Sequence, residues 1–400
     1  MDIKNLLDEQ WVRVAVWRPH TETVAIAQRA HARNTSIVTT ILMCAALTFS
    51  PAGGARSIPL QGVQTGLDSY VGFLFGSVSG YSFAFTEDTP RTLEPMAGGN
   101  LNSDSVVQLA SATKVPAALA ILTLVDAHKL NLDTPVRKYL NKFDPSFRWP
   151  NDKSDITMRM LLSHTAGFPS PPDPQSAYCL NVQSTTLRDC AQYIANASLD
   201  FEPGTTFSYA GTDYQVAGYV ATLISGKSWN DFFTDALATP LGLNTYSYGD
   251  ISNPRIAGNA QCDVTDYSKI LRMLLRDGLA DNGRRVLSHA LVREIETDQT
   301  EGLTIEPLPS LFFTGGGDLQ NDFSGYTLGF FILSSSVVAP TGSPGPIFTD
   351  PGAYGATSWL DTGLNYGGIL LINDNTTTGL EMMQSIVPTI VGDLCRGWHC

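Results

Sequence analysis

The residues that could do chemistry include Ser111 and Lys114, which lie three positions apart at the start of a long apolar stretch. If this stretch is helical, the two side chains share one face, and the lysine amine lies beside the serine hydroxyl. A serine hydroxyl is a weak nucleophile without such a base, and burial near a helix N-terminus lowers the pKa of the base. The same N-terminus offers backbone N–H groups to an oxyanion. The pattern predicts acyl transfer on Ser111, with an ordinary helix cap as the structural alternative.

Two further segments carry candidate site residues. Tyr209 follows the turn at Pro203-Gly204 and precedes a helical pattern, so its hydroxyl could face a cleft. The alternative is an aromatic side chain at the edge of a domain. The glycine-containing stretch 352–361 predicts either a strand whose backbone approaches a ligand closely or a bent edge strand.

The elements that must position these residues change in type along the chain. Strand-like runs occur at 70–76, 81–85, 326–333, 357–360 and 366–373, and helical patterns at 112–128, 268–275 and 381–394. We therefore expect an α/β (α+β) fold, in which strands from both ends of the mature chain form one antiparallel sheet flanked by helices. A mostly helical inserted lobe at about 155–315 would leave a catalytic cleft between lobe and sheet.

Taken together, the motifs resemble those of the serine beta-lactamase-like family, which includes class C beta-lactamases, D-aminopeptidases, carboxypeptidases and related esterases. Ser111–Lys114 resembles its SxxK motif, 161–167 its LLTHTSGL loop, 207–209 its tyrosine motif and 326–330 its YGLGW strand. The resemblance runs from about Gln61 to the last helical pattern and implies a beta-lactamase/transpeptidase-like fold for a domain at 56–400.

The resemblance also implies a mechanism. Ser111 would be acylated, and Lys114 and Tyr209 would share the duties of general base and general acid. The oxyanion hole would use the backbone N–H groups of Ser111 and Ala353, next to Gly352. The histidine of the 161–167 motif would be structural, and no cofactor is expected.

Two positions depart from the family pattern. Gly211 stands where the family often has an asparagine, whose amide contacts the substrate's own amide. Asp350 opens Asp350-Pro351-Gly352, where beta-lactamases and carboxypeptidases have Lys or His, then x-Gly. That cation attracts a substrate carboxylate, whereas Asp350 would repel one unless it points away. We therefore expect neither beta-lactam turnover nor simple D-Ala-D-Ala carboxypeptidase action, unless the motif is displaced by one or two residues.

Three functions follow from these observations. The first is a peptidase or amidase on an unusual peptide, such as a linearised cyclic peptide toxin. The second is a carboxylesterase of the same family. The third is a beta-lactamase or a non-catalytic penicillin-binding-like sensor, against which the retained Ser111, Lys114 and Tyr209 argue.

Composition limits the partners. The 400 residues carry 25 Lys and Arg against 38 Asp and Glu, a net charge of −13, which disfavours nucleic acid and anionic membranes. The six scattered histidines include no HExxH motif, so we expect no metal site. We expect the binding partner to be the substrate, a small peptide or ester, and the sequence does not predict the oligomeric state.

The first 55 residues have the order of an export signal, in which basic residues precede an apolar run at 37–49 and small residues at 51–55. The alternative is a buried or membrane-anchoring helix. Export would place the enzyme in the periplasm or outside the cell, with no stable membrane span after processing. Cys179 with Cys190 and Cys395 with Cys400 could then form disulfides, and Cys262 would be left over.

Overall fold

The computed structural model describes residues 60–72, 77–89, 94–169, 178–182, 184–308 and 319–396. Residues 58–400 form one compact unit. The expected export signal at 1–55 lies outside the described residues, as does Cys400. Within the described ranges, no helix combines the length and the apolar character needed to cross a membrane.

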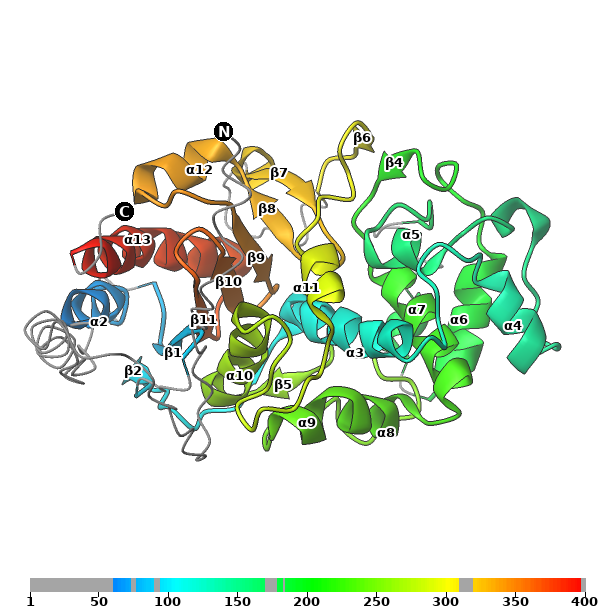
Figure 1. The fold of residues 1–400 in the computed structure, drawn as a ribbon, viewed down its shortest axis with the longest axis horizontal. Coiled ribbons are helices and arrows are strands. Elements are labelled where there is room, and N and C mark those ends of the chain that lie inside the picture. Colours follow the sequence, from blue (N-terminus) through cyan, green and yellow to red (C-terminus); the bar gives the residue numbers. More distant parts are fainter. Residues whose placement is uncertain are drawn as a thin grey trace, which may run out of the picture. The chain divides into compact units, whose positions relative to one another are not determined.

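A seven-stranded antiparallel sheet forms the centre of this unit (Figure 1). Its order is β2-β1-β11-β10-β9-β8-β7, so the early strand β1 pairs directly with the late strand β11. The expectation of one sheet built from both ends of the chain is confirmed. The strands are β1 (Gly80–Glu87), β2 (Met96–Gly99), β7 (Phe323–Tyr326), β8 (Phe331–Leu333), β9 (Ile347–Pro351), β10 (Thr357–Asp361) and β11 (Tyr366–Ile372).

Helices cover both faces of the sheet, and this explains why the central strands read as continuous apolar runs. Along β11, Leu370 and Ile372 belong to the core cluster under α2 (Gln61–Asp68) and α13 (Thr376–Cys395). The intervening Ile369 and Leu371 belong to the larger cluster on the other face. Successive strand residues point to opposite faces, so every position of β11 is buried.

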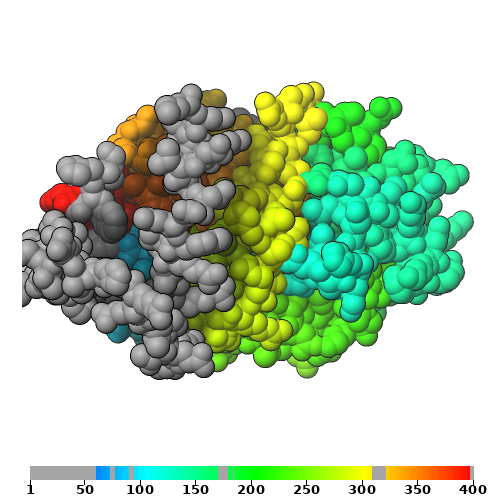
Figure 2. All heavy atoms as spheres, viewed as in Figure 1, coloured from blue at the N-terminus to red at the C-terminus, as the bar shows by residue number. Residues whose placement is uncertain are grey.

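The helical part of the unit packs around α7 (Gly211–Ser225), of which only a few side chains reach solvent. Such an all-round apolar helix is expected at the centre of a bundle. Its other helices are α4 (Arg137–Phe143), α5 (Met158–Leu162), α6 (Leu187–Asn196), α8 (Trp229–Phe233) and α9 (Thr239–Leu241), with a π-helical turn, η5 (Thr234–Ala238), between the last two. On the face shown in Figure 2, the yellow segment, which includes α11 (His289–Ile295), lies between the orange segment and the cyan and green segments.

Two details differ from the sequence expectations. Of the expected strand at 70–76, residues 73–76 lie outside the described residues, and Val71 forms an isolated bridge with Val78. The strand β1 pairs with β2 and β11. The helix α10 (Val264–Leu275) falls within 155–315 but packs against β1 and β11. Its amphipathic pattern fits a sheet-covering helix as well as a bundle helix, so sequence alone could not assign it.

The remaining elements are short and connect these layers. Two small sheets pair β3 (Val107–Gln108) with β5 (Gln261–Cys262) and β4 (Thr206–Phe207) with β6 (Thr304–Ile305). The other short helices are η2 (Ala110–Thr113), η3 (Asn151–Lys153), η4 (Tyr178–Asn181), η7 (Leu319–Asp322), α12 (Ser335–Val338) and η8 (Ala339–Thr341).

Candidate active site

Ser111 lies in the tight turn η2 that leads into the buried helix α3 (Lys114–Asp126). The β3–β5 pairing and the bond from Leu109 N–H to the Ala260 carbonyl, 2.9 Å, fix the chain before the turn. Ala110 has a φ of +46°, a left-handed conformation that costs energy for a residue with a Cβ. The backbone is therefore strained immediately before the candidate nucleophile, which is 6% exposed.

The three residues expected to act together do meet. The Lys114 Nζ atom lies 2.7 Å from the Tyr209 hydroxyl oxygen and 3.4 Å from the Ala257 carbonyl. The Ser111 side chain lies close enough to Tyr209 to lower the pKa of the tyrosine hydroxyl. All three side chains are buried, and Tyr209 lies next to both Ser111 and Lys114. Such an arrangement can carry a proton between serine and lysine.

The surroundings shift the pKa values of Lys114 and Tyr209 in opposite directions. Burial is the main cause that lowers the pKa of Lys114, Asp350 opposes the fall and the positive Arg255 assists it, and the resulting pKa is about 7. Burial raises the pKa of Tyr209 above its usual range, and the nearby Ser111 side chain only partly offsets this. Near neutral pH the lysine is available as an uncharged base, while the tyrosine remains a neutral phenol.

Asp350 is buried behind the start of α3 and does not face solvent. It is fully buried on β9, and its Oδ2 atom accepts a hydrogen bond of 3.2 Å from the Val115 N–H in the first turn of α3. The Oδ1 atom has no hydrogen-bond partner among the described residues. Burial raises the pKa of Asp350, and the nearby Lys114 opposes that rise. The carboxylate thus interacts with the lysine and the start of α3.

Gly352 allows β9 to approach the nucleophile turn. A Cβ added there would lie 2.1 Å from the Leu109 carbonyl oxygen, so only glycine fits. This contact brings Ala353, the next residue, beside η2. The backbone N–H groups of Ser111 and Ala353, which we predict to hold an oxyanion, therefore lie on two segments that this contact brings together.

His164 supports the tyrosine and is not part of the group of Ser111, Lys114 and Tyr209. It adopts a φ of +57° in a turn, and its carbonyl accepts a hydrogen bond of 2.9 Å from the Ser208 N–H. Its ring packs against the ring of Tyr209, with centroids 4.6 Å apart and the two planes tilted by 56°. Burial lowers the pKa of His164, so the ring is neutral near pH 7 and does not supply a charge to the site.

Gly211 is the first residue of α7 and has no side chain to offer a substrate. A Cβ at this position would lie 3.3 Å from Leu180 and 3.8 Å from Ala257. The position is therefore packed against two neighbouring segments near the site.

Sequence reasoning did not single out Arg255. The structure places it close enough to Lys114 and Tyr209 for its charge to act on both pKa values. It lies in an irregular loop with no periodic pattern, so nothing local in the sequence indicated that it would face the site. In the part of the chain that is described, no group of three His, Cys, Asp or Glu residues could hold a metal ion.

Comparison with known proteins agrees with this geometry. The family model described as Beta-lactamase matches residues 76–385. Penicillin-binding protein 4 of Amycolatopsis lactamdurans is 31% identical over 228 residues, which cover 48% of this chain and 57% of that protein. This chain thus spans little more than half the length of that relative.

Two solved structures share the fold. EstCE1, a hydrolase with promiscuous acyltransferase activity, has a TM-score of 0.63 at 20% identity and covers 83% of this chain and 97% of its own. The D-amino acid amidase from Ochrobactrum anthropi SV3 has a TM-score of 0.62 at 18% identity, and the match covers 83% of this chain and 98% of the amidase chain. The family-model match extends over more than three quarters of the 400 residues and includes the Ser111–Lys114 motif, and on that basis this chain belongs to the beta-lactamase family.

Proposed function

We propose that this protein is a serine hydrolase that works through an acyl-enzyme on Ser111. The observation that supports it most is the 2.7 Å contact between Lys114 Nζ and the Tyr209 hydroxyl, next to the buried Ser111. Burying a charged lysine without a carboxylate hydrogen-bonded to it destabilises the fold, whereas a neutral amine avoids most of this cost. The burial of Lys114 is therefore explained if it works as a neutral base.

In the acylation step, the Ser111 hydroxyl oxygen bonds to the substrate carbonyl carbon. Its proton passes by way of Tyr209 to the neutral amine of Lys114. The backbone N–H groups of Ser111 and Ala353 stabilise the oxyanion. The tetrahedral intermediate collapses, the leaving amine or alcohol takes the proton back by the same route, and an ester on Ser111 remains.

In the deacylation step, a water molecule attacks the ester carbonyl, and Lys114 with Tyr209 accepts its proton. The second tetrahedral intermediate releases the acid product, and the Ser111 oxygen regains a proton. The same two side chains thus serve as base in one half of each step and as acid in the other.

For the substrate, we propose a peptide or amide of unusual structure, such as a linearised cyclic peptide toxin. The shared fold with a D-amino acid amidase supports an amide substrate. The absence of a side chain at Gly211 favours a second candidate, a carboxylesterase, because an ester has no N–H group for such a side chain to recognise.

The test is mass spectrometry of the intact protein after reaction with a p-nitrophenyl ester, a peptide amide and a chromogenic cephalosporin. We expect an acyl adduct on Ser111 and none in Ser111→Ala, while the melting temperature stays the same. Lys114→Ala and Tyr209→Phe should each slow acylation by about 10²- to 10⁴-fold. Wild-type rates in Lys114→Ala would remove the lysine from the mechanism.

The same assay separates the candidate functions. Turnover of the ester alone would eliminate the peptidase, and turnover of the cephalosporin would show that Asp350 does not prevent lactam hydrolysis. No turnover and no adduct would favour a non-catalytic sensor.

We also propose that the protein works in the periplasm or outside the cell. The disulfide between Cys179 and Cys190 supports an oxidising compartment, since such bonds are rare in the cytosol of mesophiles. Cys395 is disulfide-bonded as well. Cys262 is a buried free cysteine.

A further inference from the structure

A polar pocket of about 490 Å³ lies next to the candidate active site. Its walls come from both parts of the unit: Gln108, Tyr354 and Asn373 from the sheet side, and Asn181, Arg255 and Asn259 from the loops of the helical side. We call it the arginine pocket. Five of its lining side chains are carboxamides and one is a guanidinium, so it offers hydrogen bonds and a single positive charge.

Arg255 lacks a carboxylate partner among the described residues. Its Nη1 atom donates only a long hydrogen bond of 3.4 Å to the Asn181 side chain, and its Nε atom is buried with no partner. Burial lowers the pKa of Arg255. Arg255 is half-buried, and a partly desolvated guanidinium without a counter-ion is unfavourable. Most of its five donors have no hydrogen-bond partner among the described residues.

The guanidinium group lies close to the nucleophile. A Cβ added to Gly258 would lie 3.5 Å from the Arg255 Nε atom and 3.7 Å from the Ala110 carbonyl, so Arg255 and the residue before Ser111 flank the same glycine. The electrostatic effects of Arg255 on Lys114 and Tyr209 agree with this placement. A substrate held at Ser111 therefore extends within reach of Arg255.

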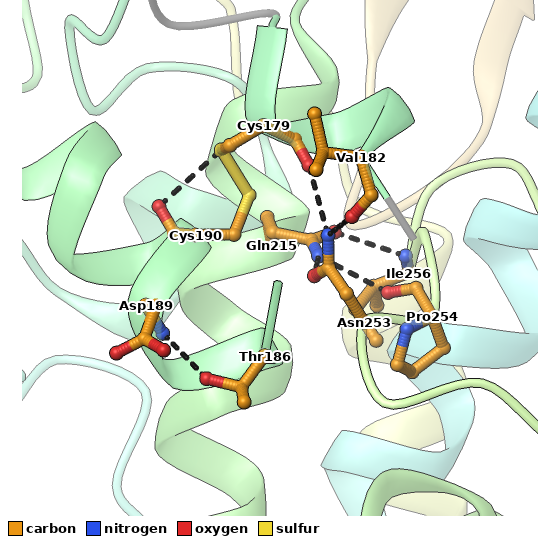
Figure 3. The surroundings of a disulfide bond; sticks show 9 residues. All are labelled: Cys179, Val182, Thr186, Asp189, Cys190, Gln215, Asn253, Pro254 and Ile256. Atoms are coloured by element: carbon orange, nitrogen blue, oxygen red, sulfur yellow. Dashed lines mark hydrogen bonds between the residues drawn. A yellow bond between two sulfur atoms is a disulfide. The ribbon is translucent and has the colours of Figure 1, made fainter. Parts of the chain in front are cut away.

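A buried network fixes the loop that carries Arg255 (Figure 3). The Gln215 side chain donates to the Asn253 side chain and the Pro254 carbonyl, at 2.8 and 3.1 Å, and accepts from the Ile256 N–H at 3.1 Å. Asn253 in turn donates to the carbonyls of Cys179 and Val182, at 2.8 and 3.1 Å. The residues on both sides of Arg255 are thus held in place before any ligand arrives, which lowers the entropic cost of binding.

We propose that Arg255 binds a carboxylate of the substrate in the arginine pocket and thereby makes this hydrolase selective for acidic substrates. The planar fork matches a carboxylate in two parallel hydrogen bonds, and the surrounding carboxamides complete its solvation. This inference rests on the proposed function. On β9, Asp350 stands in place of the cation that would attract a substrate carboxylate. The proposal assigns that attraction to Arg255, which lies on the helical side instead.

The experiment compares two matched substrate pairs in wild type and in Arg255→Gln. One pair is p-nitrophenyl glutarate and the corresponding glutaramate, and the other is a peptide with a free C-terminal carboxylate or a C-terminal amide. Rates are compared on the high-pH plateau of each protein, because Arg255→Gln removes a charge that lowers the pKa of Lys114. The readout is the ratio of kcat/KM within each pair, because a general loss of activity cancels in the ratio.

We expect wild type to prefer the carboxylate in at least one pair, and Arg255→Gln to reduce that preference by about 10- to 100-fold. Arg255→Lys keeps the positive charge but not the planar guanidinium, and should therefore retain part of the preference for the carboxylate that Arg255→Gln loses. The control is Arg284→Gln, which removes the same charge at an exposed position outside the pocket and should leave both ratios unchanged. Equal effects of Arg255→Gln on both members of both pairs would overturn the proposal.

A binding measurement separates this proposal from the catalytic one. Calorimetric titration of glutarate into Ser111→Ala, with and without Arg255→Gln, needs no turnover. Binding that disappears with Arg255→Gln supports the pocket even if Ser111 is never acylated, whereas equal binding by both proteins rejects the pocket even if acylation occurs.

Discussion

At the scale of single residues, the protonation of Lys114 sets the range of pH in which the site works. Only the uncharged amine can accept the proton of Ser111, and burial lowers the pKa of Lys114 to about 7. We expect kcat/KM for a neutral ester to fall tenfold per pH unit below pH 7 and to level off above it, as the ammonium form is lost. A pH–rate profile checks this, and an acid limb near pH 4 would assign the titration to a carboxylate instead.

Asp350 is the second residue with a testable electrostatic effect. Its negative charge favours the ammonium form of Lys114, so Asp350→Asn should lower the pKa of the lysine and move the acid limb downward by about one pH unit. The asparagine oxygen can still accept the hydrogen bond from Val115. The exposed Asp104→Asn serves as the control and should leave the profile in place. An unchanged limb in Asp350→Asn would mean that Asp350 is already uncharged near neutral pH.

At the scale of elements, local sequence predicted some parts of the site better than others. The apolar pattern after Ser111 predicts the buried helix α3, because an all-round apolar helix has to lie inside the fold. The close approach at Gly352 is also readable as a glycine in a strand, but its partner, the Leu109 carbonyl, is over two hundred residues away. Long-range contacts of this kind leave no local pattern, and for that reason sequence did not reveal the burial of Asp350 or the place of Arg255.

The disulfide between Cys179 and Cys190 ties η4 to α6 and so supports one wall of the arginine pocket. The double variant Cys179→Ala/Cys190→Ala should lower the free energy of unfolding by about 2–4 kcal/mol, because the unfolded chain regains the entropy of an open loop. Urea denaturation under non-reducing conditions measures this. Cys262→Ala leaves the disulfide intact and serves as the control for the loss of a buried cysteine. An unfolding free energy equal to that of wild type would show that the bond adds no stability.

At the scale of the whole molecule, residues far apart in sequence become neighbours. The pairing of β1 with β11 joins the early and late strands in one sheet, and this sheet brings Asp350 and Gly352 to the start of α3. The helical part brings Tyr209 and Arg255 to the same place. The site therefore depends on the packing of both parts. Because each part supplies only some of the site residues, the family resemblance could be recognised only from several motifs in order along the chain.

The same packing leads to a prediction about the first 57 residues. Residues 58–400 form a compact unit by themselves, separate from residues 1–57. A protein lacking residues 1–57 should therefore keep its melting temperature within about 2 °C and its rate of Ser111 acylation unchanged. Calorimetry and the mass-spectrometric assay measure both. A further deletion through Asp68 removes α2, whose buried Val63 and Leu67 pack in the cluster with α13, and should lower the melting temperature markedly. If the first deletion were as damaging as the second, residues 1–57 would have to contribute to the stability of the fold.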